Sequence, residues 1–100
     1  MASQNEVDDM IKRIQTSKGV QGLIIIDSEG IPIRTSMEPD VTLHYAALIS
    51  QLIVHAKRVV RELDSSQELE QLRLRSHKHE IIVAPESKYI MIVIQVPEAL

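Results

Sequence analysis

The sequence predicts an α/β fold of the α+β type, a five-stranded, mainly antiparallel sheet with a helix on each face, in the order α-β-β-α-β-β-β. Two segments, residues 20–27 and 89–96, are apolar on both faces, which is typical of strands inside a sheet that is covered above and below. Two other segments show helical periodicity and can supply these covers. Three shorter strand-like segments complete the sheet.

The first helix is predicted over about residues 4–17. Ser3 and Glu6 have the spacing of a capping box, and a left-handed cap at Gly19 would end the helix. Its apolar residues repeat at helical spacing: Val7, Met10, Ile11 and Ile14. Because its polar side is acidic, we expect this helix to pack on the sheet rather than on anionic lipid.

Residues 20–27 and 31–36 are predicted to form a β-hairpin around the turn at residues 28–30. Pro32 lacks a backbone N–H group, which places the second strand at an edge of the sheet. Gly22 lies within the first strand and predicts a bulge or a close approach of another group.

A long helix is predicted over about residues 41–63, with Asp40 as its N-cap. It carries two adjacent apolar stripes: Leu48, Leu52, Val59 and Leu63 in one, and Tyr45, Ile49, Ile53, Ala56 and Val60 in the other. One stripe is enough to cover a sheet, so the second indicates a further contact. A symmetric copy of the same chain is the simplest candidate.

The last three strands are predicted at residues 72–75, 79–84 and 89–96, after a polar loop that begins at Asp64. Leu72–Arg75 alternates apolar and cationic residues, and Lys78 follows closely. The cations either protect a sheet edge from unwanted pairing or meet acidic side chains of a partner or of a second protomer. The sequence leaves both readings open.

Composition excludes several classes of function. Residues 1–100 make a single domain, with a net charge of −3 and no basic block, so nucleic acid is not an expected partner. There is no cysteine and no phosphate-binding glycine motif, and no spacing indicates a catalytic group, so we expect no enzymatic activity and no small-molecule substrate. The polar, acidic N-terminus and the short apolar runs predict a soluble, cytoplasmic protein without membrane contact.

The four histidines do not predict a metal site. His44 and His55 lie on nearly the same helix face but about 16 Å apart. His77 and His79 can supply only two ligands, fewer than a structural or catalytic zinc ion needs. We therefore expect neither a metal nor any other cofactor.

Five segments in register resemble the roadblock-type dynein light chains, a family of the roadblock/longin-like superfamily. They are Lys18–Gly22, Glu29–Ile33, Leu72–Ser76, Glu80–Pro85 and Ile92–Gln95. Together they span almost the whole chain. The resemblance implies a non-catalytic light chain of a dynein motor complex that binds the dynein intermediate chain and supports motor assembly or cargo attachment.

The resemblance also implies a homodimer, or a heterodimer with a related light chain, in which two sheets join edge to edge and two long helices pack together. The implied interface consists of Leu48, Ile49, Leu52, Ile53 and Ala56 on the helix and Leu72, Arg73, Leu74 and Arg75 on the strand. The implied location is the cytoplasmic microtubule cytoskeleton or the ciliary axoneme. The alternative is a regulatory scaffold for small GTPases, because proteins of this superfamily that share the fold bind G proteins or their tethers.

Overall fold

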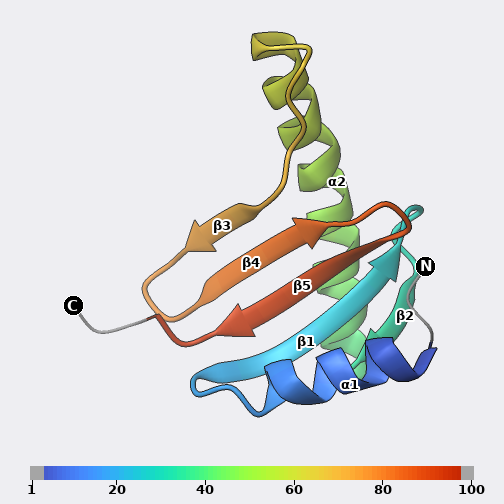
Figure 1. Cartoon of the computed structure of the whole chain (residues 1–100). Helices are drawn as coiled ribbons and strands as arrows, with labels where there is room; N and C mark the ends of the chain where they lie inside the picture. Colours follow the sequence, from blue (N-terminus) through green and yellow to red (C-terminus); the bar gives the residue numbers. More distant parts are fainter. Residues whose placement is uncertain (1–3, 98–100) are drawn as a thin grey trace.

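A computed structural model describes residues 4–97 and contains two helices and five strands in the predicted order. The elements are α1 (Gln4–Gln15), β1 (Val20–Asp27), β2 (Pro32–Thr35), α2 (Pro39–Leu63), β3 (Leu72–Arg75), β4 (Glu80–Pro85) and β5 (Tyr89–Gln95). The strands form one sheet in the order β2-β1-β5-β4-β3, and all neighbours are antiparallel (Figure 1). The predicted fold class is confirmed.

The two strands that were predicted to be interior, β1 and β5, lie side by side at the centre of the sheet. Residues 23–26 of β1 are all buried, as are Ile92, Val93 and Ile94 of β5. Burial on both faces explains why these strands lack the polar alternation of a half-exposed strand. β2 lies at one edge, as Pro32 predicted.

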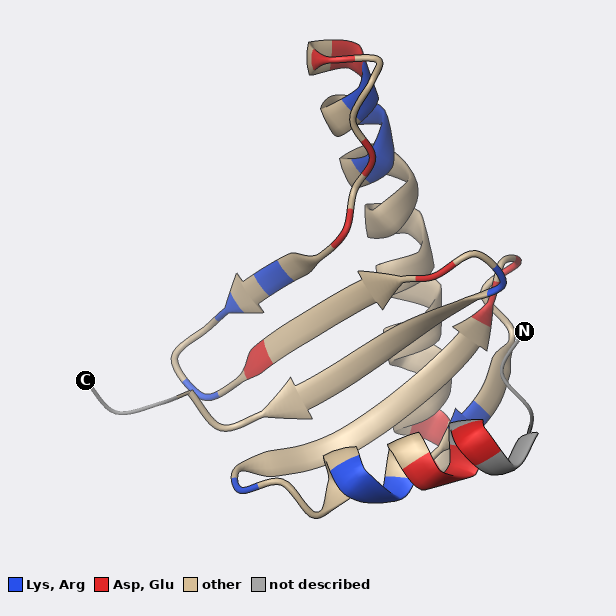
Figure 2. Cartoon of the chain, viewed as in Figure 1, with Lys and Arg blue, Asp and Glu red and all other residues tan. Residues whose placement is uncertain are grey.

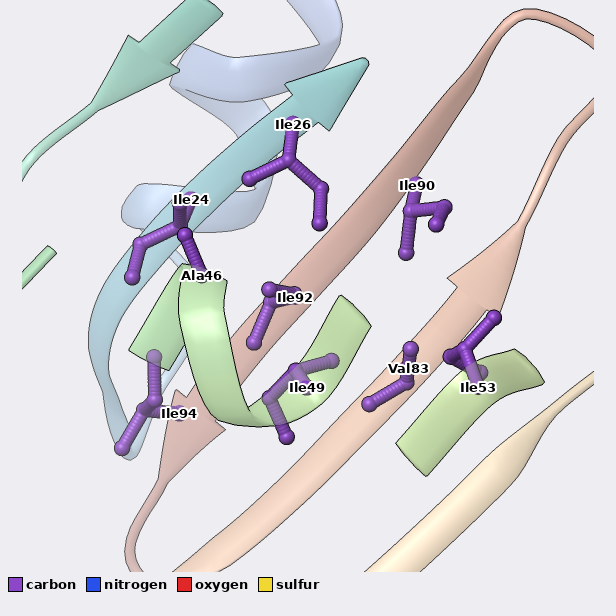
Figure 3. Packing of buried hydrophobic residues seen from close by; sticks show 9 residues of the cluster. All are labelled: Ile24, Ile26, Ala46, Ile49, Ile53, Val83, Ile90, Ile92 and Ile94. Carbon is purple, nitrogen blue, oxygen red and sulfur yellow. The ribbon is translucent and has the colours of Figure 1, made fainter. Parts of the chain in front are cut away.

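The two faces of the sheet are covered by different helices and to different extents. α2 packs on the face to which alternate residues of β1 and β5 point, and it closes the main hydrophobic core (Figure 3). That core contains Ile24, Ile26, Ala46, Ile49, Ile53, Val83, Ile90, Ile92 and Ile94. α1 is shorter and lies along β1 on the opposite face (Figure 1). Ile11 of α1 and Leu23 of β1 line the same small groove there.

Local contacts fix the β1–β2 hairpin beside α2. The Asp27 carboxylate accepts hydrogen bonds from the backbone N–H groups of Glu29 (2.8 Å) and Ile31 (2.9 Å), which shapes the turn. Gly30 has a φ of 88°, and a Cβ atom there would lie 3.0 Å from the Ser50 hydroxyl of α2. At the far end of β2, the hydroxyls of Thr35 and Thr42 are 2.8 Å apart. The hairpin therefore holds one flank of α2 at two points.

Gly22 shows both features predicted for it. The β1–β5 register shifts between Val20 and Gly22, and a Cβ atom at Gly22 would lie 2.6 Å from the Met37 sulfur. A glycine is needed here because any side chain would displace Met37.

The ends of several elements differ from the prediction. α2 begins at Pro39, with Glu38 rather than Asp40 as its cap residue and without a side-chain capping bond. Proline fits the first helical position because its φ is already helical, so the helix starts earlier than Asp40 suggested. α1 ends at Gln15, β4 is shifted by one residue, and β2 and β5 are slightly shorter than predicted. The proposed capping residue Ser3 lies outside the described residues.

Candidate functional site

α2 carries two apolar stripes with different environments. Thr42, Ala46, Ile49 and Ile53 face the sheet and are buried. The neighbouring row, here called the α2 stripe, consists of Val41, Tyr45, Leu48, Leu52, Val59 and Leu63. Within it Leu48 is 56% exposed and Leu63 is 83% exposed. Tyr45 and Leu52 are half-buried, and the other four members are exposed. Several large exposed apolar side chains along one row indicate a surface that another molecule covers.

The α2 stripe faces the β3 side of the molecule. Ser50, on the opposite flank of the helix, touches the turn between β1 and β2 at the other side of the sheet. Tyr45 and Leu52 pack against the border of the main core, as do Leu72 and Leu74 of β3. The exposed row of α2 and the edge strand β3 therefore adjoin the same core.

β3 ends the sheet, and within the described residues it pairs only with β4. Its outer edge presents backbone N–H and C=O groups to solvent, which is an arrangement that favours pairing with another strand. Leu72 and Leu74 point toward the core face of α2, and Arg73 and Arg75 point to the opposite face.

A hydrogen-bonded group at the end of the sheet ties β3 to its neighbours. The Glu80 carboxylate, on a side chain that is only 10% exposed, accepts bonds from Arg73 Nη2 (2.6 Å) and Gln95 Nε2 (2.7 Å). The Arg73 hydrogen bond lowers the pKa of Glu80; burial opposes this shift, and Gln95 and the charge of Arg75 add to it. The carboxylate is thus ionised at neutral pH and links three strands.

Acid is expected to weaken this link. Because the pKa of Glu80 is lowered on folding, its contribution to stability is present above its unfolded pKa and is lost as pH falls through the folded value. Glu80→Gln should lower the melting temperature at about pH 7, as measured by circular dichroism. Between about pH 7 and about pH 3, the melting temperature of this variant should decrease less than that of the wild-type protein. Parallel pH profiles for the wild-type and variant proteins would contradict this assignment.

The residues that the resemblance placed at the helix interface differ in exposure in the structure. Leu48, Leu52 and Ala56 retain exposed surface, whereas Ile49 (5% exposed) and Ile53 (2%) are buried against the sheet of their own chain. The sequence reading also missed the carboxylate of Glu80. Residues 72–75 alternate between apolar and cationic side chains, and a short turn leads from them to β4. These two signals could have predicted that Glu80 lies opposite Arg75.

An open hollow of about 1030 Å³ lies near the C-terminal half of α2. Most of its lining is polar: Lys57, Arg61, Ser65, Ser66, Gln67, Glu68, Glu70, Glu86 and Ser87, with Leu69 and Pro85 as the apolar members. Small-molecule sites are predominantly apolar and enclosed. This space is an open hollow between the helix, the 64–71 loop and the β4–β5 turn.

The described residues contain no group of three or more His, Cys, Asp or Glu side chains that could hold a metal ion. No helix in residues 4–97 combines the length and apolar character needed to cross a membrane.

Sequence comparison agrees with the helix-and-sheet arrangement. The model of the Roadblock/LC7 domain matches residues 6–96, which include every strand and nearly all of both helices. The chain belongs to the Roadblock/LC7 domain family. In this Roadblock/LC7 domain, the α2 stripe exposes large apolar side chains, and β3 has a neighbouring strand on one side only within residues 4–97.

Solved structures share the fold at low sequence identity. A Roadblock/LC7 domain from Streptomyces avermitilis is 18% identical, with a TM-score of 0.81 over 92% of this chain and 80% of that one. MglB of Myxococcus xanthus is 13% identical, with a TM-score of 0.79 over 95% and 79%. A structure of MglB with a tetrameric arrangement is 9% identical, with a TM-score of 0.78 over 96% and 76%. These similarities establish the fold of the Roadblock/LC7 domain.

Proposed function

We propose that the protein is a non-catalytic, dimeric light chain of a dynein motor complex, which binds the dynein intermediate chain and supports motor assembly or cargo attachment. The observation that carries the dimer is the exposed α2 stripe beside the free edge of β3. A second copy of the chain, related to the first by a two-fold axis, can cover both features at once. Its own β3 and α2 then lie next to β3 and α2 of the first copy.

The geometry of such a dimer follows from the position of α2. Both α2 helices must lie on the same side of the joined sheet if they are to touch. A two-fold axis perpendicular to the sheet meets this condition, pairing two β3 strands antiparallel and setting the two α2 helices antiparallel. The dimer would thus have one continuous ten-stranded sheet with both α2 helices on one face.

Charges along α2 suit this antiparallel contact. Glu38 and Asp40 lie at its start, and Lys57, Arg58 and Arg61 lie near its end (Figure 2). In an antiparallel pair, the acidic start of one helix lies toward the basic end of the other. Opposite charges at the rim of an interface favour this orientation over a parallel one.

Surface area supports the same conclusion. The chain exposes 7156 Å², whereas a folded monomer of 11.3 kDa is expected to expose about 5,700 Å². The excess is larger than the ~800 Å² that each partner buries in a standard interface. The C-terminal turns of α2 project beyond the sheet (Figure 1), and their apolar residues Val59 and Leu63 are exposed.

The motor assignment rests on the five segments that resemble roadblock-type dynein light chains. The fold is also compatible with the alternative, a regulatory scaffold for small GTPases, because one fold serves several functions. The proposed location is cytoplasmic, on microtubule motors in the cell body or the ciliary axoneme.

An affinity purification tests this function directly. Tagged wild-type protein is expected to retain dynein intermediate and heavy chains from cytosolic and ciliary extracts, in near-stoichiometric amounts by mass spectrometry. Recovery of small GTPases or their membrane tethers without motor chains would instead favour the alternative. A variant that cannot dimerise, described in the Discussion, serves as the control.

A further inference from the structure

The loop between α2 and β3, residues 64–71, is the longest segment without helix or strand in the part of the chain that the structure describes. It starts with a turn that the Gln67 N–H group closes on the Asp64 carbonyl (3.0 Å). Asp64 Oδ1 also accepts hydrogen bonds from the Ser66 hydroxyl (2.7 Å) and N–H group (3.0 Å), and these bonds lower the pKa of Asp64. Ser65, the first of the two central residues, is exposed and takes part in none of these bonds. The fold therefore uses Ser66 to shape the turn and leaves the Ser65 hydroxyl accessible at its tip.

The chain around Ser65 is acidic and exposed. Positions 62–70 contain no Lys or Arg, and every residue from 61 to 68 is exposed. Four acidic residues lie within five positions of Ser65: Glu62, Asp64, Glu68 and Glu70. Figure 2 shows the acidic positions along this loop and the basic ones on the last turns of α2. A protein that recognises this segment by its charge therefore needs a basic groove.

Glu68, three positions after Ser65, is the acidic neighbour that such a groove can reach most easily. It lies in the loop, where local opening costs little, and its side chain is 81% exposed. Glu62, three positions before Ser65, is in the last turn of α2 and cannot extend unless the helix unwinds. Acidophilic protein kinases select a serine with a carboxylate at the third following position, because their substrate groove is basic. The segment from Ser65 to Glu68 matches that pattern.

We propose that Ser65 is a phosphorylation site for an acidophilic protein kinase whose basic groove binds the loop through Glu68. ATP supplies the γ-phosphoryl group. A bond forms from Ser65 Oγ to the γ-phosphorus, the bond from that phosphorus to the bridging oxygen breaks, and ADP leaves. The hydroxyl proton passes to a carboxylate of the kinase. The site is complete in a single chain and does not depend on the proposed dimer.

The open hollow beside α2 offers the phosphate a cationic partner. Lys57 and Arg61 lie one helical turn apart and line this hollow together with Ser65. The Arg61 guanidinium is 3.4 Å from the Glu68 carboxylate, in a pair whose two side chains are mostly exposed and which contributes little stability. Two further carboxylates line the hollow and are exposed, where salt screens their charge: Glu70 and Glu86. A phosphate carries about −1.5 to −2 charges, so it would take Arg61 from Glu68 and tie the end of α2 to the loop.

Incubation of the full chain with ATP and casein kinase II, an acidophilic kinase, tests the site. Mass spectrometry should find phosphate on Ser65, and Ser65→Ala should lose it. We expect Glu68→Gln to slow the reaction about fivefold or more, and Glu62→Gln, the same charge change on the helical side, to slow it less than about twofold. Phosphate on Ser66 in place of Ser65, no phosphate in this loop, or equal slowing by the two glutamine variants would overturn the proposed site.

The position of the phosphate is tested by NMR of the arginine side chains before and after phosphorylation. The Nε–H signal of Arg61 should shift more than that of any other arginine, because a guanidinium that binds a phosphate donates shorter hydrogen bonds. Arg58 is the matched control, since it lies three positions earlier on α2 and does not line the hollow. An unchanged Arg61 signal, or an equal shift of Arg58, would refute the pairing in the hollow.

Discussion

Replacing Leu48 by glutamate is expected to turn the dimer into a folded monomer. Leu48 is 56% exposed in the single chain, so a charge there leaves the core intact. In the proposed dimer the same carboxylate would be buried against the apolar stripe of the second helix without a partner. We expect the free energy of dimerisation to weaken by about 2 kcal/mol or more, which raises the Kd of the dimer about thirtyfold. Analytical ultracentrifugation measures this change.

Val54→Glu is the matched control for this experiment. Val54 lies on the same helix and is 65% exposed, but it is on the flank of Ser50, which faces the β1–β2 turn. This variant should remain dimeric, with a circular dichroism spectrum like that of Leu48→Glu. Dissociation by both variants, or by neither, would count against the α2 stripe as the interface. Leu52→Glu is less informative because Leu52 also packs against the core.

The second large effect is expected at Ile92, which lies at the centre of the sheet. It is fully buried, and its cross-strand neighbours Ile24 and Val83 belong to the same core (Figure 3). Ile92→Ala should lower the free energy of unfolding by about 2–5 kcal/mol, because it removes apolar contacts and leaves a cavity. Small domains have only about 5–15 kcal/mol in total.

Denaturant titrations at several protein concentrations measure this effect, since dimerisation adds a concentration-dependent contribution to stability. Ile92→Val provides a graded comparison and should cost about 0.5–1.5 kcal/mol. A cost below about 1 kcal/mol for Ile92→Ala would mean that the side chains around β5 can close over the missing atoms.

Much of the fold could be predicted because its signals are local. Unbroken apolar runs identified β1 and β5 as interior strands, and Pro32 identified β2 as an edge. The two stripes of α2 were also visible in the sequence. The sequence does not specify which of the two stripes faces the sheet, because both are equally apolar. Contacts of the hairpin with Thr42 and Ser50 decide which stripe faces the sheet, and they place Ile49 and Ile53 in the core.

The hydrogen-bonded group around Glu80 could not be predicted from local sequence patterns. Glu80 meets Arg73 and Gln95 only after three strands have paired, and Gln95 is 15 positions further along the chain. The partial cover by α1 likewise depends on where a short helix lies across a wide sheet. Features of this kind follow from register and helix placement, which sequence periodicity does not specify.

β2 has a further consequence once β3 is used for pairing. Each end of a joined sheet would then be a β2 strand of only four residues, with Pro32 in it and a register irregularity opposite Ile26. A short strand that lacks a backbone donor and is locally irregular is a poor template for another chain. Edge-to-edge growth would therefore stop at two copies, which protects an aliphatic-rich protein from polymerising into fibres.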